Sequence, residues 1–179
     1  MRIHYVSGSR ADFGLMAETL KYLLRRGFEI EVVATGQHLS QAYGNTIEDI
    51  ESSEIPIAGR IPVKLTGLSG AEMGFALAEE LKGFVEFWQR SRPDLVLVLG
   101  DRGEMVAGAL AAIHLGLHVA HIHGGELSGT LDESFRHAIT KLAHYHFVVN
   151  EEARDRLVKM GENSIASLML NKLFCQHQN

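Results

Sequence analysis

Residues 94–100 read Asp-Leu-Val-Leu-Val-Leu-Gly, and this segment constrains the fold more than any other. A continuous apolar run of this length, closed by a glycine, is typical of a strand that is buried on both faces of a parallel sheet. Parallel strands are joined by crossover connections, which are usually helices. The segment therefore predicts a central strand in a sheet that is covered by helices.

The rest of the chain alternates strand and helix patterns as such a sheet requires. A long helix is expected to open at the capping box Ser69–Glu72 and to end before Pro93. With 179 residues, 46% of them hydrophobic, the chain can bury one substantial core. The alternation predicts an α/β fold with a doubly wound, Rossmann-like parallel sheet of about six strands. Strands are expected at residues 3–7, 29–35, 57–63, 94–100, 118–123 and 144–149, and further helices at 13–26, 45–53, 105–117, 131–143 and 151–160.

Composition argues against several classes of protein. The net charge is −5 and the basic residues are dispersed, so no nucleic-acid-binding surface is expected. Cys175 is the only cysteine, so an intrachain disulfide is impossible and nothing indicates an oxidising compartment. The sequence shows neither a signal peptide nor an apolar stretch long enough for a membrane helix, which predicts a cytoplasmic protein without a membrane partner.

Two turns at the predicted carboxyl ends of strands carry charged residues. The first, Gly8–Gly14, places Arg10 at the start of a helix, where free backbone N–H groups favour an anion. It lacks the G-x-G-x-x-G fingerprint, so NAD is not expected. The second, Gly100-Asp101-Arg102, follows the central strand, where ligands bind in such sheets. The alternatives are that Arg10 lies on the surface and that Asp101 caps the next helix.

The segment from His121 to His137 is the richest in groups that can carry chemistry. His121 and His123 are expected on one face of a strand, because side chains alternate with a period of two. Gly124 and Gly125 would let a ligand approach the backbone closely. The loop and helix that follow carry Glu126, Asp132, Glu133, Arg136 and His137.

Structural interpretations compete with these functional ones. Thr130 and Glu133 have the spacing of a capping box, and Asp132 with Arg136 has that of an i,i+4 ion pair. The pairs His121/His123 and His144/His146 lack a recognised metal-site spacing, so no metal is predicted. The core face of this helix is expected to consist of Leu131, Phe135, Ala138, Ile139 and Leu142.

Several motifs together resemble the hydrolysing UDP-N-acetylglucosamine 2-epimerases. The resemblance covers about residues 1–161 and rests on Ser-Arg-Ala-Asp at 9–12, Gly-Gln-His-Leu at 36–39, Tyr-Gly-Asn-Thr at 43–46, Gly-Asp-Arg at 100–102 and the block 121–146. It implies the N-terminal lobe of a glycosyltransferase-B-like fold that uses no cofactor. It also implies conversion of UDP-GlcNAc and water to UDP and N-acetylmannosamine, through a glycal, for sialic acid synthesis.

The resemblance also implies roles for individual residues. Arg10 and Arg102 match positions that hold the UDP phosphates, with Gly14 close by, and Asp101 and Asp132 match acids assigned to catalysis or sugar positioning. The expected catalytic set is Asp101, Asp132, His123, Glu126 and Glu133. The expected substrate-binding set is Arg10, Gly14, His38, Arg102, Gly124, Gly125, Arg136 and His137.

The chain departs from the family at two places. Position 123 often carries glutamate in the family, whereas this chain has His123, so His123 or Glu126 would act as acid or base, or the substrate would be a related nucleotide such as UDP-diacetylbacillosamine. Residues 162–179 are expected to be a divergent tail, and the second, UDP-binding domain that the resemblance implies is expected to be absent.

Two expectations follow from the missing domain. The chain alone should be inactive, and the alternative is a non-catalytic binding or interaction module. A homo-oligomer is also expected, because the tail carries apolar residues at approximately helical spacing. These are Ile165, Leu168, Met169, Leu170, Leu173 and Phe174.

Overall fold

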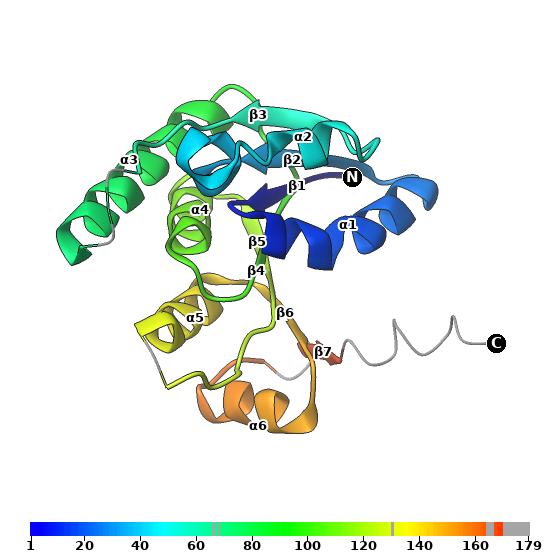
Figure 1. Ribbon diagram of the computed structural model, residues 1–179. Helices are drawn as coiled ribbons and strands as arrows, with labels where there is room; N and C mark the ends of the chain where they lie inside the picture. The colour runs from blue at the N-terminus through cyan, green and yellow to red at the C-terminus, as the bar shows by residue number, and fades with distance from the viewer. Residues whose placement is uncertain (66, 68, 130, 164–166, 170–179) are drawn as a thin grey trace.

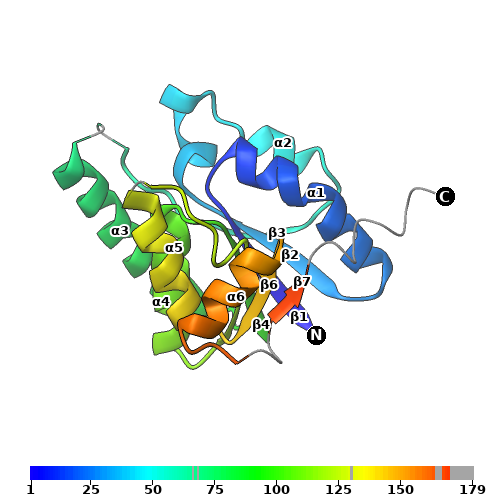
Figure 2. The ribbon, with the colours of Figure 1, turned by 90° about the horizontal axis from the view of Figure 1, so that it is seen from below.

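The computed structural model describes residues 1–65, 67, 69–129, 131–163 and 167–169. These residues form a sheet between two layers of helices (Figures 1 and 2). The strands are β1 (Arg2–Ser7), β2 (Glu29–Ala34), β3 (Ile57–Arg60), β4 (Leu95–Leu99), β5 (His118–Ile122), β6 (Tyr145–Val148) and β7 (Ser167–Met169). The α-helices are α1 (Arg10–Arg25), α2 (Ile47–Glu51), α3 (Gly70–Trp88), α4 (Gly103–His114), α5 (Leu131–Leu142) and α6 (Glu151–Lys159), and two 3₁₀ turns are η1 (Gly36–Leu39) and η2 (Gln41–Tyr43).

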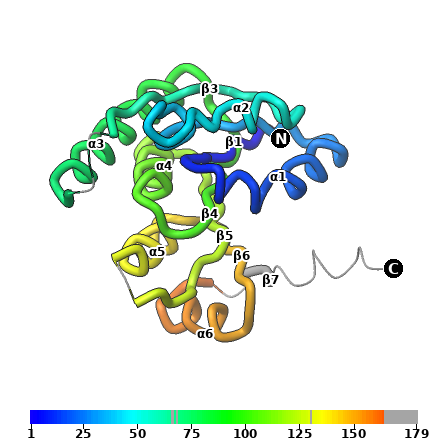
Figure 3. Tube along the Cα trace, viewed as in Figure 1, coloured from blue at the N-terminus to red at the C-terminus, as the bar shows by residue number. Residues whose placement is uncertain are grey.

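All seven strands are parallel and lie in the order β3-β2-β1-β4-β5-β6-β7. The chain runs outward from β1 to β3, returns through α3 to β4, and then runs to the other edge, as the trace in Figure 3 shows. The predicted fold class is therefore confirmed. The strand order reverses between β1 and β4, and their carboxyl ends define the switch point at which such sheets bind ligands.

The seventh strand lies beyond residue 161, where the sequence suggested a tail with helical spacing. That expectation is wrong for Leu168 and Met169, which pair in register with Phe147 and Val148 of β6. Backbone pairing with the open edge of β6 determines the conformation here, and local apolar spacing does not. The other tail residues named for that spacing, Ile165, Leu170, Leu173 and Phe174, lie outside the described residues.

Each sheet face has its own core. Helices α1 and α2 cover one face, where Phe13, Met16 and Leu20 pack on side chains of β1, β2 and β4. Helices α3, α4 and α5 cover the other face, where Phe84 and Trp88 stack with ring centroids 4.9 Å apart. Both faces of the central strands are thus buried, as the apolar run of β4 predicted.

A buried polar pair completes the second core. Trp88 donates from Nε1 to Nδ1 of His4 at 3.0 Å, and both side chains are fully buried. Burial lowers the pKa of His4 to about 4, so its ring is neutral and accepts this hydrogen bond. The indole of Trp88 therefore lies in the core without an unpaired donor.

Helix ends follow the sequence signals. Ser9 and Asp12 form a capping box at the start of α1, and Gly27 lies just past its end with φ +84°. The predicted box Ser69–Glu72 opens α3. None of the helices in the described part of the chain is long and apolar enough to cross a membrane.

The predicted core face of α5 is only partly correct. Its buried residues are Arg136, Ile139 and Thr140, whereas Leu131 is 62% exposed and Ala138 is also exposed. Arg136 turns inward because it forms ion pairs with two acids at the sheet edge. This requirement rotates the helix away from the orientation that its apolar residues alone suggest.

Phe84 provides a test of the second core. We expect Phe84→Ala to lower the free energy of unfolding by about 3–5 kcal/mol, because it removes a fully buried ring and leaves a cavity. Phe75→Ala on the same helix is the control, since Phe75 is 73% exposed and its loss should change stability by less than about 0.5 kcal/mol. Urea denaturation followed by circular dichroism measures both, and equal losses would contradict this description of the core.

Candidate functional site

The turn after β1 is fixed by Asp12. Its carboxylate accepts hydrogen bonds from the hydroxyl of Ser7, from Ser9 Oγ at 2.7 Å, and from the backbone N–H groups of Gly8 and Ser9 at 3.2 and 2.7 Å. Arg10 stands on this rigid turn with its side chain 70% exposed, paired to Asp49 at 2.6 Å. An exposed ion pair of this kind is weak, so Arg10 can exchange Asp49 for an anion in solution.

His38 joins this turn to the segment after β2. Its Nε2 lies 2.9 Å from Ser7 Oγ and its Nδ1 lies 2.8 Å from Thr46 Oγ1. The side chain is fully buried, and burial lowers its pKa, so the ring is neutral. His38, predicted to contact substrate, is not at the surface here and instead couples two loops. Gly14, also predicted in the binding set, lies on the exposed side of α1.

The turn after β4 contains the pair that the sequence singled out. Arg102 is the N-cap residue of α4, so Asp101 does not have the capping position considered for it. Gly100 has φ +78°, which a glycine adopts without strain. Arg102 donates from Nε to Glu104 at 2.6 Å while its side chain remains 43% exposed. Arg102 is therefore both held in place and accessible.

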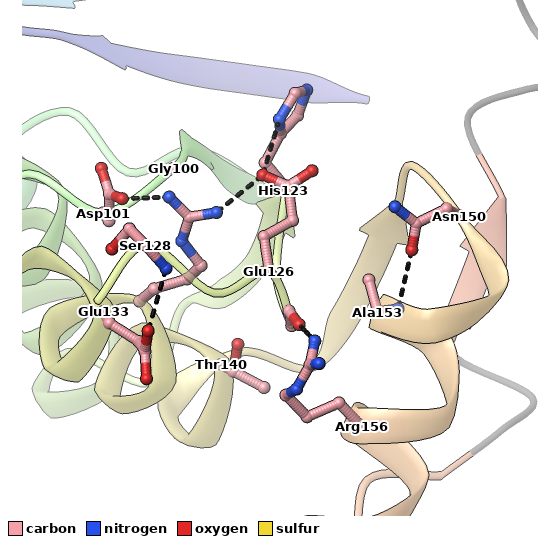
Figure 4. Close-up of polar contacts among 12 residues, drawn as sticks. Gly100, Asp101, His123, Glu126, Ser128, Glu133, Thr140, Asn150, Ala153 and Arg156 are labelled. Atoms are coloured by element: carbon pink, nitrogen blue, oxygen red, sulfur yellow. Dashed lines mark hydrogen bonds and ion pairs between the residues drawn. The ribbon is translucent and has the colours of Figure 1, made fainter. Parts of the chain in front are cut away.

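Arg136 connects this turn to the loop after β5. Its guanidinium forms ion pairs with Asp101 and, at 2.6 Å, with Glu126, and Glu126 in turn lies 3.4 Å from Nδ1 of His123. Figure 4 shows Asp101, Glu126 and His123 grouped at this edge of the sheet. The Arg136 side chain is only 10% exposed. Four of the predicted site residues thus form one continuous charged cluster.

His121 and His123 have different surroundings, contrary to the expectation that they share one strand face. The strand ends at Ile122, and His123 has a left-handed backbone with φ +65°, so the period of two does not extend to it. A non-glycine residue in this region is uncommon and is typical of functional turns.

His121 has a structural role, because it holds the elements that carry the cluster together. Its Nε2 donates to Gly100 O at 2.7 Å, and its Nδ1 faces Thr140 Oγ1 at 3.2 Å. Burial lowers its pKa to about 3, so the ring is neutral and fixed in one tautomer. It therefore ties the turn after β4 to α5.

The histidine pairs do not assemble a metal site among the described residues, where no group of three or more potential ligands is found. His144 lies edge-to-face against His118 with ring centroids 4.9 Å apart, and buried His146 lies 3.2 Å from Glu162.

The predicted site residues at the start of α5 have different surroundings. Glu133 accepts hydrogen bonds from the N–H groups of Ser128 and Gly129 at 2.9 and 2.8 Å, and these bonds lower its pKa. These bonds are to residues that precede the helix, and the capping box considered for Glu133 stays a prediction because its partner Thr130 lies outside the described residues. Asp132 is exposed, and Arg136 pairs with Asp101 and Glu126 rather than with it. His137 lies 4.0 Å from Glu133.

Gly124 and Gly125 are required by packing against protein atoms. A Cβ on Gly124 would lie 3.0 Å from His121 Nδ1, and one on Gly125 would lie 2.5 Å from the carbonyl oxygen of Ala153. Gly125 also has φ +81°, and its carbonyl accepts a hydrogen bond from Arg156 of α6. Sequence reasoning missed Arg156, because no local pattern links a helix residue to a loop 31 positions earlier.

A surface pocket adjoins this loop. It measures about 320 Å³ and is lined in part by Glu126, Asn150 and Arg156, with Asn150 and Arg156 lying on the α6 side in Figure 4. Another hollow of about 500 Å³ lies beside β3 and α3, lined in part by Arg60 and Lys82. It contains none of the predicted site residues, so the smaller pocket is the better candidate for a ligand.

These features define an α/β lobe whose switch point carries two accessible arginines and a partly buried arginine–carboxylate cluster. The chain belongs to the UDP-N-acetylglucosamine 2-epimerase family, whose model matches residues 21–167. It is 51% identical over 162 residues to the hydrolysing UDP-N,N'-diacetylbacillosamine 2-epimerase of Legionella pneumophila, covering 90% of this chain and 43% of that protein. Its identity to the UDP-N-acetylglucosamine 2-epimerase of Neisseria meningitidis is 37%, over 90% of this chain and 42% of that protein.

Solved structures agree on the fold. The Neisseria meningitidis UDP-GlcNAc 2-epimerase bound to UDP-GlcNAc superposes with a TM-score of 0.81 at 23% identity, covering 94% of this chain and 45% of that one. A putative UDP-N-acetylglucosamine 2-epimerase from Listeria monocytogenes also gives 0.81 at 23% identity, covering 93% and 44%. The chain spans less than half the length of these relatives.

Gly125 offers a test of the loop. We expect Gly125→Ala to lower the free energy of unfolding more than Gly129→Ala does. Both glycines have positive φ, a strain of about 1–2 kcal/mol for alanine, but a Cβ at Gly129 meets open space. The collision at Gly125 should add about 1–3 kcal/mol. Thermal unfolding measures both, and equal losses would contradict the close packing of this loop on α6.

Arg136 offers a test of the charged cluster. We expect Arg136→Met to lower the free energy of unfolding by about 3–5 kcal/mol at pH 7, because two acids would lose their partner. Arg154→Met is the control, since Arg154 is 39% exposed and pairs with exposed Glu151, a contact that contributes less than about 1 kcal/mol. Urea denaturation compares them, and a loss below 1 kcal/mol for Arg136→Met would contradict the assigned role.

Proposed function

We propose that this chain is the N-terminal lobe of a hydrolysing 2-epimerase acting on a UDP-linked 2-acetamido sugar. The observation that carries the proposal is the Asp101–Arg136–Glu126–His123 cluster, which lies at the carboxyl edge of the sheet next to Arg102. The overall reaction takes the UDP-sugar and water to UDP and the free 2-epimer. The cluster and its neighbouring arginines suit this reaction, because proton transfer at C2 requires a base and departure of UDP requires cations.

The proposed reaction has two parts. In the first, a base removes the proton at C2, the C1–O bond breaks, and UDP leaves with the electron pair to give a glycal. In the second, water adds across the glycal double bond. Its oxygen bonds to C1, and C2 receives a proton on the face opposite to the one that lost its proton in the first part. Asp101, Glu126 and His123 are the candidates for these proton transfers, because they are linked through Arg136 in one cluster.

The anion of the leaving group would be held on the β1–β4 side of the site. Arg102 is fixed through Nε by Glu104, and Arg10 stands on the turn that Asp12 fixes. Guanidinium groups fit phosphate oxygens well, and the N-terminus of α1 adds a favourable dipole. Asp132 remains a candidate for sugar positioning.

Two sugars fit the proposal. The 51% identity to the Legionella enzyme supports a UDP-N,N'-diacetylbacillosamine substrate, and His123 at a position where the family often has glutamate fits a departure from UDP-GlcNAc. UDP-GlcNAc is the second candidate, supported by the Neisseria relative at 37%. Similarity of 34% to polysialic acid biosynthesis protein P7 of Escherichia coli supports a product used in sialic-acid-type sugar synthesis. A cytoplasmic location and a homo-oligomer remain part of the proposal.

The reaction can be tested in a protein that has both lobes. Such a protein can be made by joining residues 1–161 to the second lobe of the Legionella relative. It should convert UDP-diacetylbacillosamine, and more slowly UDP-GlcNAc, to UDP and the free 2-epimer. Asp101→Asn should lower kcat by about 10²–10⁴, the usual contribution of one acid–base group. Residues 1–179 alone should form no product, because half of the substrate-positioning surface would be absent.

The products separate the alternatives. Formation of a UDP-linked epimer would indicate a non-hydrolysing enzyme, and a requirement for an acceptor would indicate a glycosyltransferase. Weak UDP binding without turnover in the joined protein would support a binding module instead.

A further inference from the structure

Glu80 is a buried acid that the proposed reaction does not use. It lies on the inner side of α3, where the other buried residues are Ala76, Phe84 and Trp88, and it is only 4% exposed. Its carboxyl group lies close to Gly36, in the segment that follows β2 and packs on the turn after β1. A Cβ on Gly36 would lie 3.7 Å from Glu80 Oε1 and 3.0 Å from the carbonyl oxygen of Gly8.

The hydrogen bonds around Glu80 indicate its protonation state. Thr35 Oγ1 lies 2.9 Å from the carbonyl oxygen of Ile61 and 3.4 Å from Glu80 Oε1. A threonine hydroxyl has a single hydrogen, and a carbonyl oxygen can only accept. The shorter contact therefore takes the Thr35 hydrogen. The longer one is satisfied only when the carboxyl group of Glu80 donates its own proton to Thr35 Oγ1.

A second carboxyl group accounts for the retention of that proton. Glu104 is also buried and pairs with Arg102, and its carboxyl group fills the space that a side chain on Gly8 would need. With Glu80 protonated, the one negative charge of Glu104 is matched by the one positive charge of Arg102. Burial and the charge of Glu104 raise the pKa of Glu80 to about 8.

We infer that Glu80 is a positioning residue, a protonated acid that leaves Glu104 as the carboxylate paired with Arg102 and orienting it for an anion. The role in orienting Arg102 for an anion rests on the proposed function, whereas the protonated state of Glu80 does not. Within the described part of the chain, the groups facing Glu80 are Thr35 from the end of β2 and Glu104 and Arg102 from the start of α4. Ionisation of Glu80 would place a second negative charge beside the arginine.

The bound proton makes stability depend on pH. A glutamate in the unfolded chain releases its proton near its usual value of 4.5, whereas folded Glu80 keeps it to about pH 8. Between these values the folded state holds one more proton, so its stability falls as pH rises. Above pH 8 this contribution is constant, because both states are ionised.

The first experiment compares wild type, Glu80→Gln and Glu86→Gln by urea denaturation from pH 6 to pH 9. Glutamine keeps a neutral donor at position 80, and Glu86 is an exposed acid on the same helix. Relative to Glu80→Gln, the unfolding equilibrium constant of wild type should rise about tenfold per pH unit up to pH 8 and then level off. Glu86→Gln should follow wild type. Parallel curves for wild type and Glu80→Gln would overturn the inference.

If Glu80→Gln does not fold, the ¹³C chemical shift of the Glu80 carboxyl group in the wild-type chain gives the answer directly. A protonated shift at pH 7 that titrates near pH 8 supports the inference, and an ionised shift at pH 7 overturns it.

The second experiment measures the dissociation constant of UDP over the same pH range, in the joined two-lobe protein described above. Wild type should bind UDP severalfold more weakly at pH 9 than at pH 7, and Glu80→Gln should bind equally at both. An equal loss in both proteins would overturn the positioning role even if the proton is present. If UDP binds at neither pH, the proposed function is contradicted, and denaturation still decides the state of Glu80.

Discussion

The arrangement of the site depends on the ion pairs of Arg136, because they join the turn after β4 to the loop after β5. Arg136 projects from α5 toward the ends of β4 and β5 and forms ion pairs with both Asp101 and Glu126. Removing the cation would leave two neighbouring carboxylates without a partner, which is costly where they are poorly solvated. The same ion pairs connect α5 to the turn after β4 and to the loop after β5, where Glu126 also lies beside His123.

Two neutral histidines support the turns that carry the site. His38 and His121 are buried between strands and turns, and burial lowers the pKa of each. They supply directional hydrogen bonds without adding charge to a poorly solvated region. The charged side chains Arg10, Arg102 and the Arg136 cluster lie at the carboxyl edge of the sheet, each paired with an acid. The division suits a lobe that must hold a nucleotide anion rigidly, as proposed above.

Much of this structure could be predicted from the sequence. The apolar run of β4 can only be a strand covered on both faces, and the capping box Ser69–Glu72 marked the start of α3. Turns at the carboxyl ends of parallel strands meet at one edge of a sheet, so the turns with Arg10 and Arg102 could be placed there from the sequence. Family motifs added roles for these residues.

Three-dimensional packing decided the rest, because it pairs residues that are distant in the sequence. The sequence by itself determined the alternation of elements, the fold class and the turns that carry polar groups, since these depend on local periodicity and caps. Only the tertiary structure buried His38, turned Arg136 inward on α5 and brought Arg156 to the carbonyl of Gly125. It also placed Glu80 next to Glu104, because burial and charge pairing depend on neighbours that no local pattern specifies.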